Sequence, residues 1–394
     1  MSLSNSPRTQ ALLVVVLSLT IRSTVAAEPQ PRDHDLASRL ASAISVYRQI
    51  EARGGWQPIP EGPPLTLGAR GPRVAFLRAR LERTRDLAPQ ALGNGFDEML
   101  EAAVRRFQSR NGLSADGVVG AATRAELNVP VEGRIETLRA NLQRLQTWYG
   151  PPRRLLLVNV PAFEVRAVED GREVFAKRAI VGLASWRTPE VVSRVDRIVV
   201  NPSWTVPRSI VRKELVPHMR RDPQYLDREG IIVFDGWDAA ARPIDPQKVD
   251  WWSPRAARLR FWQPPGATNP LGRLKFVFDN PYRVFLHDTP RKHLFERPVR
   301  ALSHGCIRVD GATEIASWLL RGQDNWTPQT FAAAIKTGGT ATIRLQDPAD
   351  IAIVYWTAWV DEQGTVQFRR DIYRRDRAVP QPAAVKIVEP DVGP

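Results

Sequence analysis

The chain has 394 residues, more than one ordinary hydrophobic core accommodates, so we expect two or three folded units. Its 43% of apolar and 25% of charged residues are typical of a globular protein and exclude a largely disordered chain. The formal charge of +14 favours anionic partners, but the arginines are scattered and no nucleic-acid-binding motif is present, which argues against nucleic acid.

The first 27 residues have the pattern of a cleavable export signal. Arg8 precedes an apolar run, Ala11–Ile21, and small residues lead up to Ala27. This run of eleven residues is shorter than the ~20 that cross a bilayer, so we favour cleavage near Ala27 over an uncleaved anchor. Loss of Arg8 and Arg22 lowers the charge from +14 to +12. The anionic cell wall or a membrane surface is the expected partner of such a chain.

Residues 28–64 are expected to form an N-terminal scaffold segment and a linker. The apolar residues Leu36, Leu40, Ile44 and Ile50 follow a loose helical spacing. Four prolines between residues 54 and 64 then interrupt the pattern, which indicates the linker.

Residues 65–128 predict a small unit of three helices, from two helical faces and an Asp116-Gly117 turn. The stretch resembles the peptidoglycan-binding module of wall-active enzymes. The residues that carry this resemblance are Ala103, Val104, Phe107, Gln108, Gly112, Leu113, Asp116, Gly117, Gly120 and Thr123. The resemblance implies that the module binds peptidoglycan. A packing domain that has lost its ligand is the alternative.

Residues 129–152 predict a connecting helix, after which the periodicity changes from helical to strand-like. Residues 153–346 are the expected catalytic domain. Apolar or alternating runs occur at 155–160, 163–167, 174–181, 198–200, 275–278 and 284–286. Strands with few helices between them favour a β-rich sandwich or barrel over alternating βαβ units, so the whole chain is expected to be a multidomain α+β protein.

The strand pattern is interrupted at about residues 201–265, where five of the twelve tryptophans lie. An insertion of this length is usually functional or mobile. Its aromatic residues either form a small core of their own or line a substrate cleft as a cap. Further strands are expected at 347–377, followed by a disordered tail at 378–394.

Cys306 is the only cysteine of the chain. A thiol acts as a nucleophile when a base or a cation favours its thiolate and when donors stabilise the oxyanion that forms. His287 is a candidate base, the amides around Gly305 and Cys306 are candidate oxyanion donors, and Arg308 is a candidate ligand for a substrate carboxylate. A metal bound by His287, His304 and Cys306 is the other option, disfavoured because no C-x-x-C repeat is present.

The segment 286–290, Leu-His-Asp-Thr-Pro, is followed at 302–309 by Leu-Ser-His-Gly-Cys-Ile-Arg-Val. This pattern resembles the signature of the L,D-transpeptidases with a YkuD-type catalytic domain. Residues 201–207 and 355–359 resemble the larger Gram-negative branch, in which an insertion caps the active site. The resemblance implies that Cys306 is the nucleophile and His287 its general base. It also implies that His304, Gly305 and Arg308 shape the oxyanion and substrate site, with Ser303 supporting them, although many members have Asn at the position of Arg308.

The resemblance further implies a periplasmic, wall-associated enzyme that needs neither a metal nor another cofactor and reacts with carbapenems. Its partners would be peptidoglycan tetrapeptide stems, as donor and acceptor, and other cell-wall synthases are further candidates. Transfer to a second stem gives a 3-3 cross-link, transfer to water makes an L,D-carboxypeptidase, and transfer to a protein lysine makes an anchoring enzyme. A wall-binding scaffold without activity is the non-enzymatic alternative. The sequence leaves the acceptor and the oligomeric state open.

Overall fold

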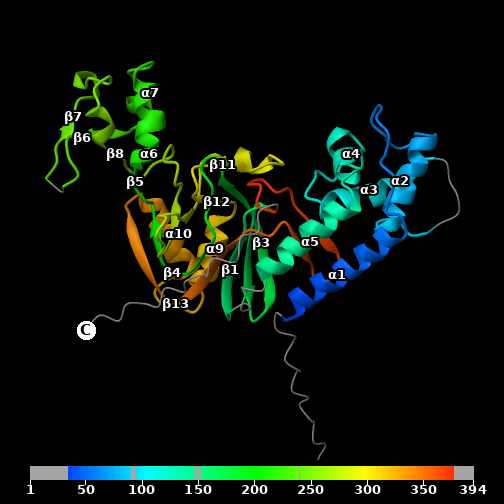
Figure 1. Ribbon diagram of the computed structural model, residues 1–394. Coiled ribbons are helices and arrows are strands. Elements are labelled where there is room, and N and C mark those ends of the chain that lie inside the picture. The colour runs from blue at the N-terminus through cyan, green and yellow to red at the C-terminus, as the bar shows by residue number, and fades with distance from the viewer. Residues whose placement is uncertain (1–33, 90–94, 146–147, 149–151, 239, 377–394) are drawn as a thin grey trace, which may run out of the picture.

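The computed structural model describes residues 34–89, 95–145, 148, 152–238 and 240–376. The expected export signal and C-terminal tail lie outside the described residues. The protein is a mixed α+β structure in which a helical N-terminal module and a β-rich domain are joined by a pair of long helices (Figure 1). No helix within the described ranges combines the length and the hydropathy that crossing a membrane requires.

The N-terminal module contains the three expected helices, α2 (Pro72–Arg83), α3 (Glu98–Arg110) and α4 (Ala121–Leu127). Their apolar faces, including Val74, Leu77 and Phe107, form one hydrophobic core. The Gln108 side chain holds the turn before α4, because its Nε2 donates to Asp116 Oδ1 at 2.7 Å and its Oε1 accepts from Gly117 N at 2.8 Å. Gly117 has a φ of +78°, which disfavours any residue with a Cβ.

The proline-rich stretch after α1 is fixed in place, which differs from a free linker. Ile59 is buried in the core of the module, and its backbone exchanges hydrogen bonds of 2.8 and 3.0 Å with the Asn128 side chain. Helix α1 (His34–Ala52) lies along α5 (Val131–Leu145), as Figure 1 shows, and the two share a core with the C-terminal strands β14 (Ala358–Val360) and β15 (Val366–Phe368). The C-terminal strands therefore belong to the joint between the module and the β domain.

The β domain is a closed sheet. Strand pairing runs in the order β3-β12-β10-β9-β4-β13-β1-β2 and returns from β2 to β3, so the barrel-like alternative is the one observed. The strands are β1 (Arg154–Asn159), β2 (Glu164–Glu169), β3 (Arg172–Gly182), β4 (Val191–Val200), β9 (Leu274–Phe278), β10 (Leu286–His287), β12 (Ile307–Val309) and β13 (Ala341–Val354). Strand β11 (Ala301–Ser303) pairs with the end of β3, and α9 (Ala312–Leu319) and α10 (Pro328–Thr337) pack on the enclosed core.

Strand β13 crosses residue 346, where the sequence suggested the end of the catalytic domain. Its first part pairs with β4 up to Arg344, and after an irregularity the pairing resumes at Ala349. Pro348 lies in this irregularity, where a missing backbone donor is tolerated. Because the alternation of buried and exposed residues is broken here, the sequence of one strand looks like two. The residues up to Val354 belong to the barrel.

The insertion has its own four-stranded sheet, β5-β8-β6-β7, seen at the upper left of Figure 1. Its elements are β5 (Trp204–Thr205), α6 (Arg208–Ile210), η1 (Val211–Leu215), α7 (Val216–Met219), α8 (Tyr225–Glu229), β6 (Ile232–Phe234), β7 (Pro243–Ile244), η2 (Pro246–Lys248), η3 (Ala256–Arg258) and β8 (Arg260–Gln263). A separate core includes Val211, Leu215 and the buried Trp251, whereas Trp252 is 73% exposed. Some of the tryptophans therefore form a core and others remain at the surface.

Candidate active site

The adjacent strands β9, β10 and β12 place two predicted residues, His287 and Arg308, on one face of the barrel sheet. In the register of β9, β10 and β12, His287 is opposite Lys275 on one side and Arg308 on the other. The row next to it, Phe276, Leu286 and Ile307, is buried in the barrel core. Because side chains alternate along a strand, Lys275, His287 and Arg308 project together from the opposite face.

Cys306 directly precedes β12 and is half-buried beside this row. The amide of the next residue, Ile307, donates to Phe285 O at 2.9 Å, which fixes Cys306 against the strand that carries His287. Burial raises the pKa of the Cys306 thiol, while a backbone hydrogen bond from Phe285 and the charges of Lys275 and Arg308 act in the opposite direction. Lys275 and Arg308 thus favour the thiolate form of Cys306, whereas burial favours the neutral thiol.

His287 is buried and neutral. Its Nδ1 lies 2.6 Å from Asp288 O, and because a carbonyl only accepts, Nδ1 carries the hydrogen and Nε2 is left as the acceptor. Burial and then the charge of Arg308 lower the pKa of His287 to about 3. The arrangement supplies an oriented, unprotonated nitrogen, which is what a general base requires.

Ser303 and Thr188 hold the turn that leads to Cys306. Ser303 Oγ donates to Cys306 O at 2.5 Å and accepts from Gly305 N at 3.2 Å. Thr188 Oγ1 donates to Gly305 O at 2.8 Å, and Gly305 has a φ of +110° that favours glycine. Because the Gly305 amide is directed at Ser303, the Cys306 amide is the better candidate for an oxyanion donor.

His304 connects the turn to the insertion. Its Nε2 lies 2.5 Å from Glu214 Oε1 on η1, and its ring packs edge-on against Trp186 at a centroid distance of 5.1 Å. Lys213, also on η1, places its Nζ 4.2 Å from the centroid of Trp186. The insertion therefore has its own core and also contacts the active-site turn.

Tyr373 is a supporting residue that sequence reasoning missed. Its hydroxyl donates to Gly182 O at 2.7 Å and accepts from Thr188 N at 3.1 Å. Thr188 also donates to Gly305 O, so Tyr373 supports the active-site turn through Thr188. No local pattern could reveal this contact, because it joins the C-terminal segment to the loop after β3.

Changing Tyr373 to phenylalanine is expected to lower the free energy of unfolding by about 1–3 kcal/mol, because the change leaves the buried Gly182 carbonyl and Thr188 amide without this partner. Urea denaturation measures the loss. The control is Tyr282→Phe, since Tyr282 is 60% exposed and its change is expected to be nearly neutral. Equal stability of the two variants would contradict a bracing role for Tyr373.

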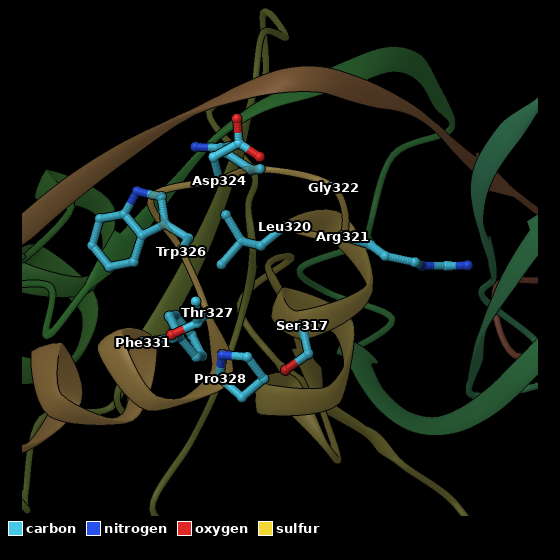
Figure 2. Close-up of a pocket in the computed structure, with 10 residues that line it drawn as sticks. Ser317, Leu320, Arg321, Gly322, Asp324, Trp326, Thr327, Pro328 and Phe331 are labelled. Atoms are coloured by element: carbon cyan, nitrogen blue, oxygen red, sulfur yellow. The ribbon is translucent and has the colours of Figure 1, made fainter.

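Metal ligation and a separate cavity are the two alternatives to a site at Cys306. Within the described parts of the chain, no group of three or more His, Cys, Asp or Glu side chains is arranged to hold a metal ion. A cavity of about 440 Å³ lies between the end of α9 and the start of α10, with Leu320, Trp326 and Phe331 among its lining residues (Figure 2). None of the predicted site residues lines it, so the candidate chemistry remains at Cys306.

Two parts of the chain match known protein families. Residues 153–332 match the family model of the YkuD L,D-transpeptidase catalytic domain, and residues 70–127 match that of the "Putative peptidoglycan binding domain". A curated relative, the "Putative L,D-transpeptidase" of Haemophilus influenzae, is 35% identical over 228 residues, which cover 57% of this chain and 45% of the relative. The chain thus spans less than half the length of that relative.

Two solved structures of L,D-transpeptidases are also similar. The one from Xylanimonas cellulosilytica is 17% identical, with a TM-score of 0.24, and the match covers 75% of this chain and 99% of the other. The one from Stackebrandtia nassauensis is 14% identical, with a TM-score of 0.27, covering 76% and 97%.

Proposed function

We propose, from the premise that this chain carries an L,D-transpeptidase catalytic domain together with a peptidoglycan-binding domain, that it cross-links peptidoglycan through an acyl-enzyme on Cys306. The observation that supports the proposal most directly is the neutral imidazole of His287. Its ring lies on the same face of the barrel sheet as Lys275 and Arg308. Its Nδ1 is held by Asp288 O, and its Nε2 is left to accept a proton.

In the first half-reaction, Cys306 Sγ attacks the carbonyl of the third, diamino-acid residue of a tetrapeptide stem. His287 Nε2 takes the thiol proton as the sulfur–carbon bond forms. The carbon–nitrogen bond to the terminal D-alanine then breaks, and His287 returns the proton to the leaving amine. The Cys306 amide is the donor that we assign to the oxyanion. In the second half-reaction, the side-chain amine of another stem attacks the thioester, which releases the thiol and forms a 3-3 cross-link.

Arg308 is the residue that we assign to a carboxylate of the stem. It is largely buried beside Cys306, and its Nε is one of the buried nitrogens that have no hydrogen-bond partner in the described structure. Burial and the nearby Arg291 lower the pKa of Arg308. An anionic ligand would offset both effects and satisfy the free nitrogen.

The helical module is proposed to hold the enzyme on the wall. Its helix α3 contacts the C-terminal segment, because Arg369 Nη1 donates to Arg110 O at 3.1 Å, and in the joint Arg134 of α5 lies 4.4 Å from the centroid of Phe368 on β15. These contacts support a fixed joint in place of a flexible tether. The expected export signal and the match to a peptidoglycan-binding domain favour a periplasmic, wall-associated enzyme.

The acceptor decides between the transpeptidase and its alternatives. Purified muropeptides with tetrapeptide stems are incubated with the enzyme, and the products are separated and weighed. A cross-linked dimer with loss of D-alanine supports the transpeptidase, whereas tripeptide alone supports the carboxypeptidase. Stem attached to an added envelope protein supports the anchoring enzyme. If no product forms and a carbapenem leaves Cys306 unmodified, the scaffold without activity is the better account.

The pH dependence of acylation follows from the protonation state of His287. Because its pKa is lowered to about 3, His287 stays unprotonated from pH 5 to 8, and the rate of carbapenem acylation is expected to show no inflection near pH 6.5. The rate should rise only as the pH approaches the raised pKa of Cys306. Acylation is followed by mass spectrometry in buffers of constant ionic strength. Loss of half the rate between pH 6 and 7 would contradict a neutral, buried His287.

A further inference from the structure

Two cations flank the imidazole of His287. In the strand register, Lys275 is next to His287 on β9 and Arg308 is next to it on β12. Among the ion pairs of the described residues, neither cation has a carboxylate partner, although both are partly buried. A buried cation is normally stabilised by a negative charge, and a charge that develops on the Cys306 sulfur is one such partner within the chain.

Lys275 is held beside the nucleophile by Phe285. Its Nζ lies 3.7 Å from the centroid of the Phe285 ring, and Phe285 O is the acceptor for the amide that follows Cys306. Burial lowers the pKa of Lys275, and its charge interaction with Cys306 is the next largest influence, in the opposite direction. The charge of Lys275 in turn lowers the pKa of Cys306.

The site needs such a cation because His287 does not provide one. In many thiol enzymes a protonated histidine stabilises the thiolate, but the pKa of His287 is lowered to about 3 and the imidazole is neutral at rest. A sulfur that gains negative charge in a buried site must then be stabilised by another charge. The charge of Arg308 also lowers the pKa of Cys306, but its Nε has no hydrogen-bond partner in the described structure and is available for the substrate.

We propose that Lys275 is the electrostatic partner of Cys306: its ammonium group, positioned by the Phe285 ring, stabilises the negative charge that develops on sulfur, so that His287 can remain a neutral base. The proposal rests on the proposed function only in taking Cys306 as the nucleophile. It assigns to β9 a functional residue that the sequence analysis did not single out.

The charged or titratable groups around Lys275 define the control. Cys306, Arg308 and His287 lie toward the site, and Arg197 lies on the neighbouring strand β4, opposite Val277 of β9. Arg197 is exposed and paired with Asp196 at 3.1 Å, and its charge lowers the pKa of Lys275. Arg197→Gln therefore removes a positive charge from the same region without removing the one that acts on sulfur.

The test is the rate of alkylation of Cys306 by iodoacetamide between pH 6 and 10, measured for the full chain by intact mass. Because Cys306 is the only cysteine, the rate reports its thiolate alone. Lys275→Met is expected to raise the apparent pKa by about one unit, which makes alkylation about tenfold slower at pH values below both pKa values. Lys275→Arg should retain most of the wild-type rate, and Arg197→Gln should follow the wild-type curve.

The proposal would be overturned if Lys275→Met were alkylated with the same pH dependence as the wild type. It would also be overturned if Arg197→Gln raised the apparent pKa of alkylation as much as Lys275→Met does. Urea denaturation establishes that each variant is folded. If Lys275→Met does not fold, Phe285→Leu provides the same test, because loss of the ring frees Nζ and should also raise the pKa of alkylation. A wild-type protein that no carbapenem acylates refutes the proposed function, whereas acylation with an unchanged Lys275→Met curve refutes this inference alone.

Discussion

Changing Cys306 to alanine is expected to abolish both the carbapenem adduct and every product from tetrapeptide stems. Cys306 is the only cysteine of the sequence, so no second thiol can replace it. Loss of a covalent nucleophile typically lowers the rate by at least about 10³-fold, which is below detection in an adduct assay. Intact mass after incubation with a carbapenem measures the result directly.

The control for Cys306→Ala is stability. Cys306 is half-buried at the edge of the barrel core, so removal of its sulfur should change the free energy of unfolding by no more than about 1 kcal/mol. Cys306→Ser keeps the size of the side chain and should be nearly inactive, because a hydroxyl is a much weaker acid than a thiol and supplies far less of the attacking anion. An adduct on folded Cys306→Ala would mean that another residue is the nucleophile.

The sequence predicts the parts of this protein that depend on local patterns. The helical module follows from the spacing of Val74, Leu77 and Leu81, and its three helices are confirmed. The mixed α+β class and the barrel-like domain are also confirmed, because runs of alternating residues identify strands wherever one face is buried. Cys306 and His287 are predicted as site residues because both stand in short motifs of chemically reactive side chains.

Other features depend on pairing between distant segments, which no local pattern reveals. Strand β10 has only two residues, yet its register brings Lys275, His287 and Arg308 together. The contact between His304 and Glu214 depends on how the insertion folds over the turn. A lysine in an alternating strand predicts a solvated face, and only the neighbouring strands show that Lys275 is partly buried beside the nucleophile.

Local irregularities account for the remaining differences. Pro348 makes β13 look like two strands, and the prolines around Ile59 look like a linker although the segment is packed into the module. In both places proline marks a missing backbone donor, but it does not say whether the chain around it is free or fixed. Hydrogen bonds to Asn128 decide the second case, and they come from a residue far along the chain.

Changing His287 to alanine is expected to slow acylation of Cys306 by about 10²–10⁴-fold at pH 7, the usual contribution of a general base. The matched control is His293→Ala, because His293 lies on η4 (Lys292–Glu296), is exposed, and should be nearly silent. The time course of the carbapenem adduct measures both rates.

His287 is also buried, so the alanine variant creates a cavity, and loss of rate could follow from loss of structure. His287→Gln separates the two effects, since it fills most of the space and offers an amide in place of the basic nitrogen. If glutamine restores stability but not the rate, the basicity of Nε2 is what acylation needs. If glutamine restores both, or if His287→Ala and His293→Ala slow acylation equally, the base is not His287. In that case the cations Lys275 and Arg308 would remain as the groups that activate Cys306, because both act on the sulfur through charge.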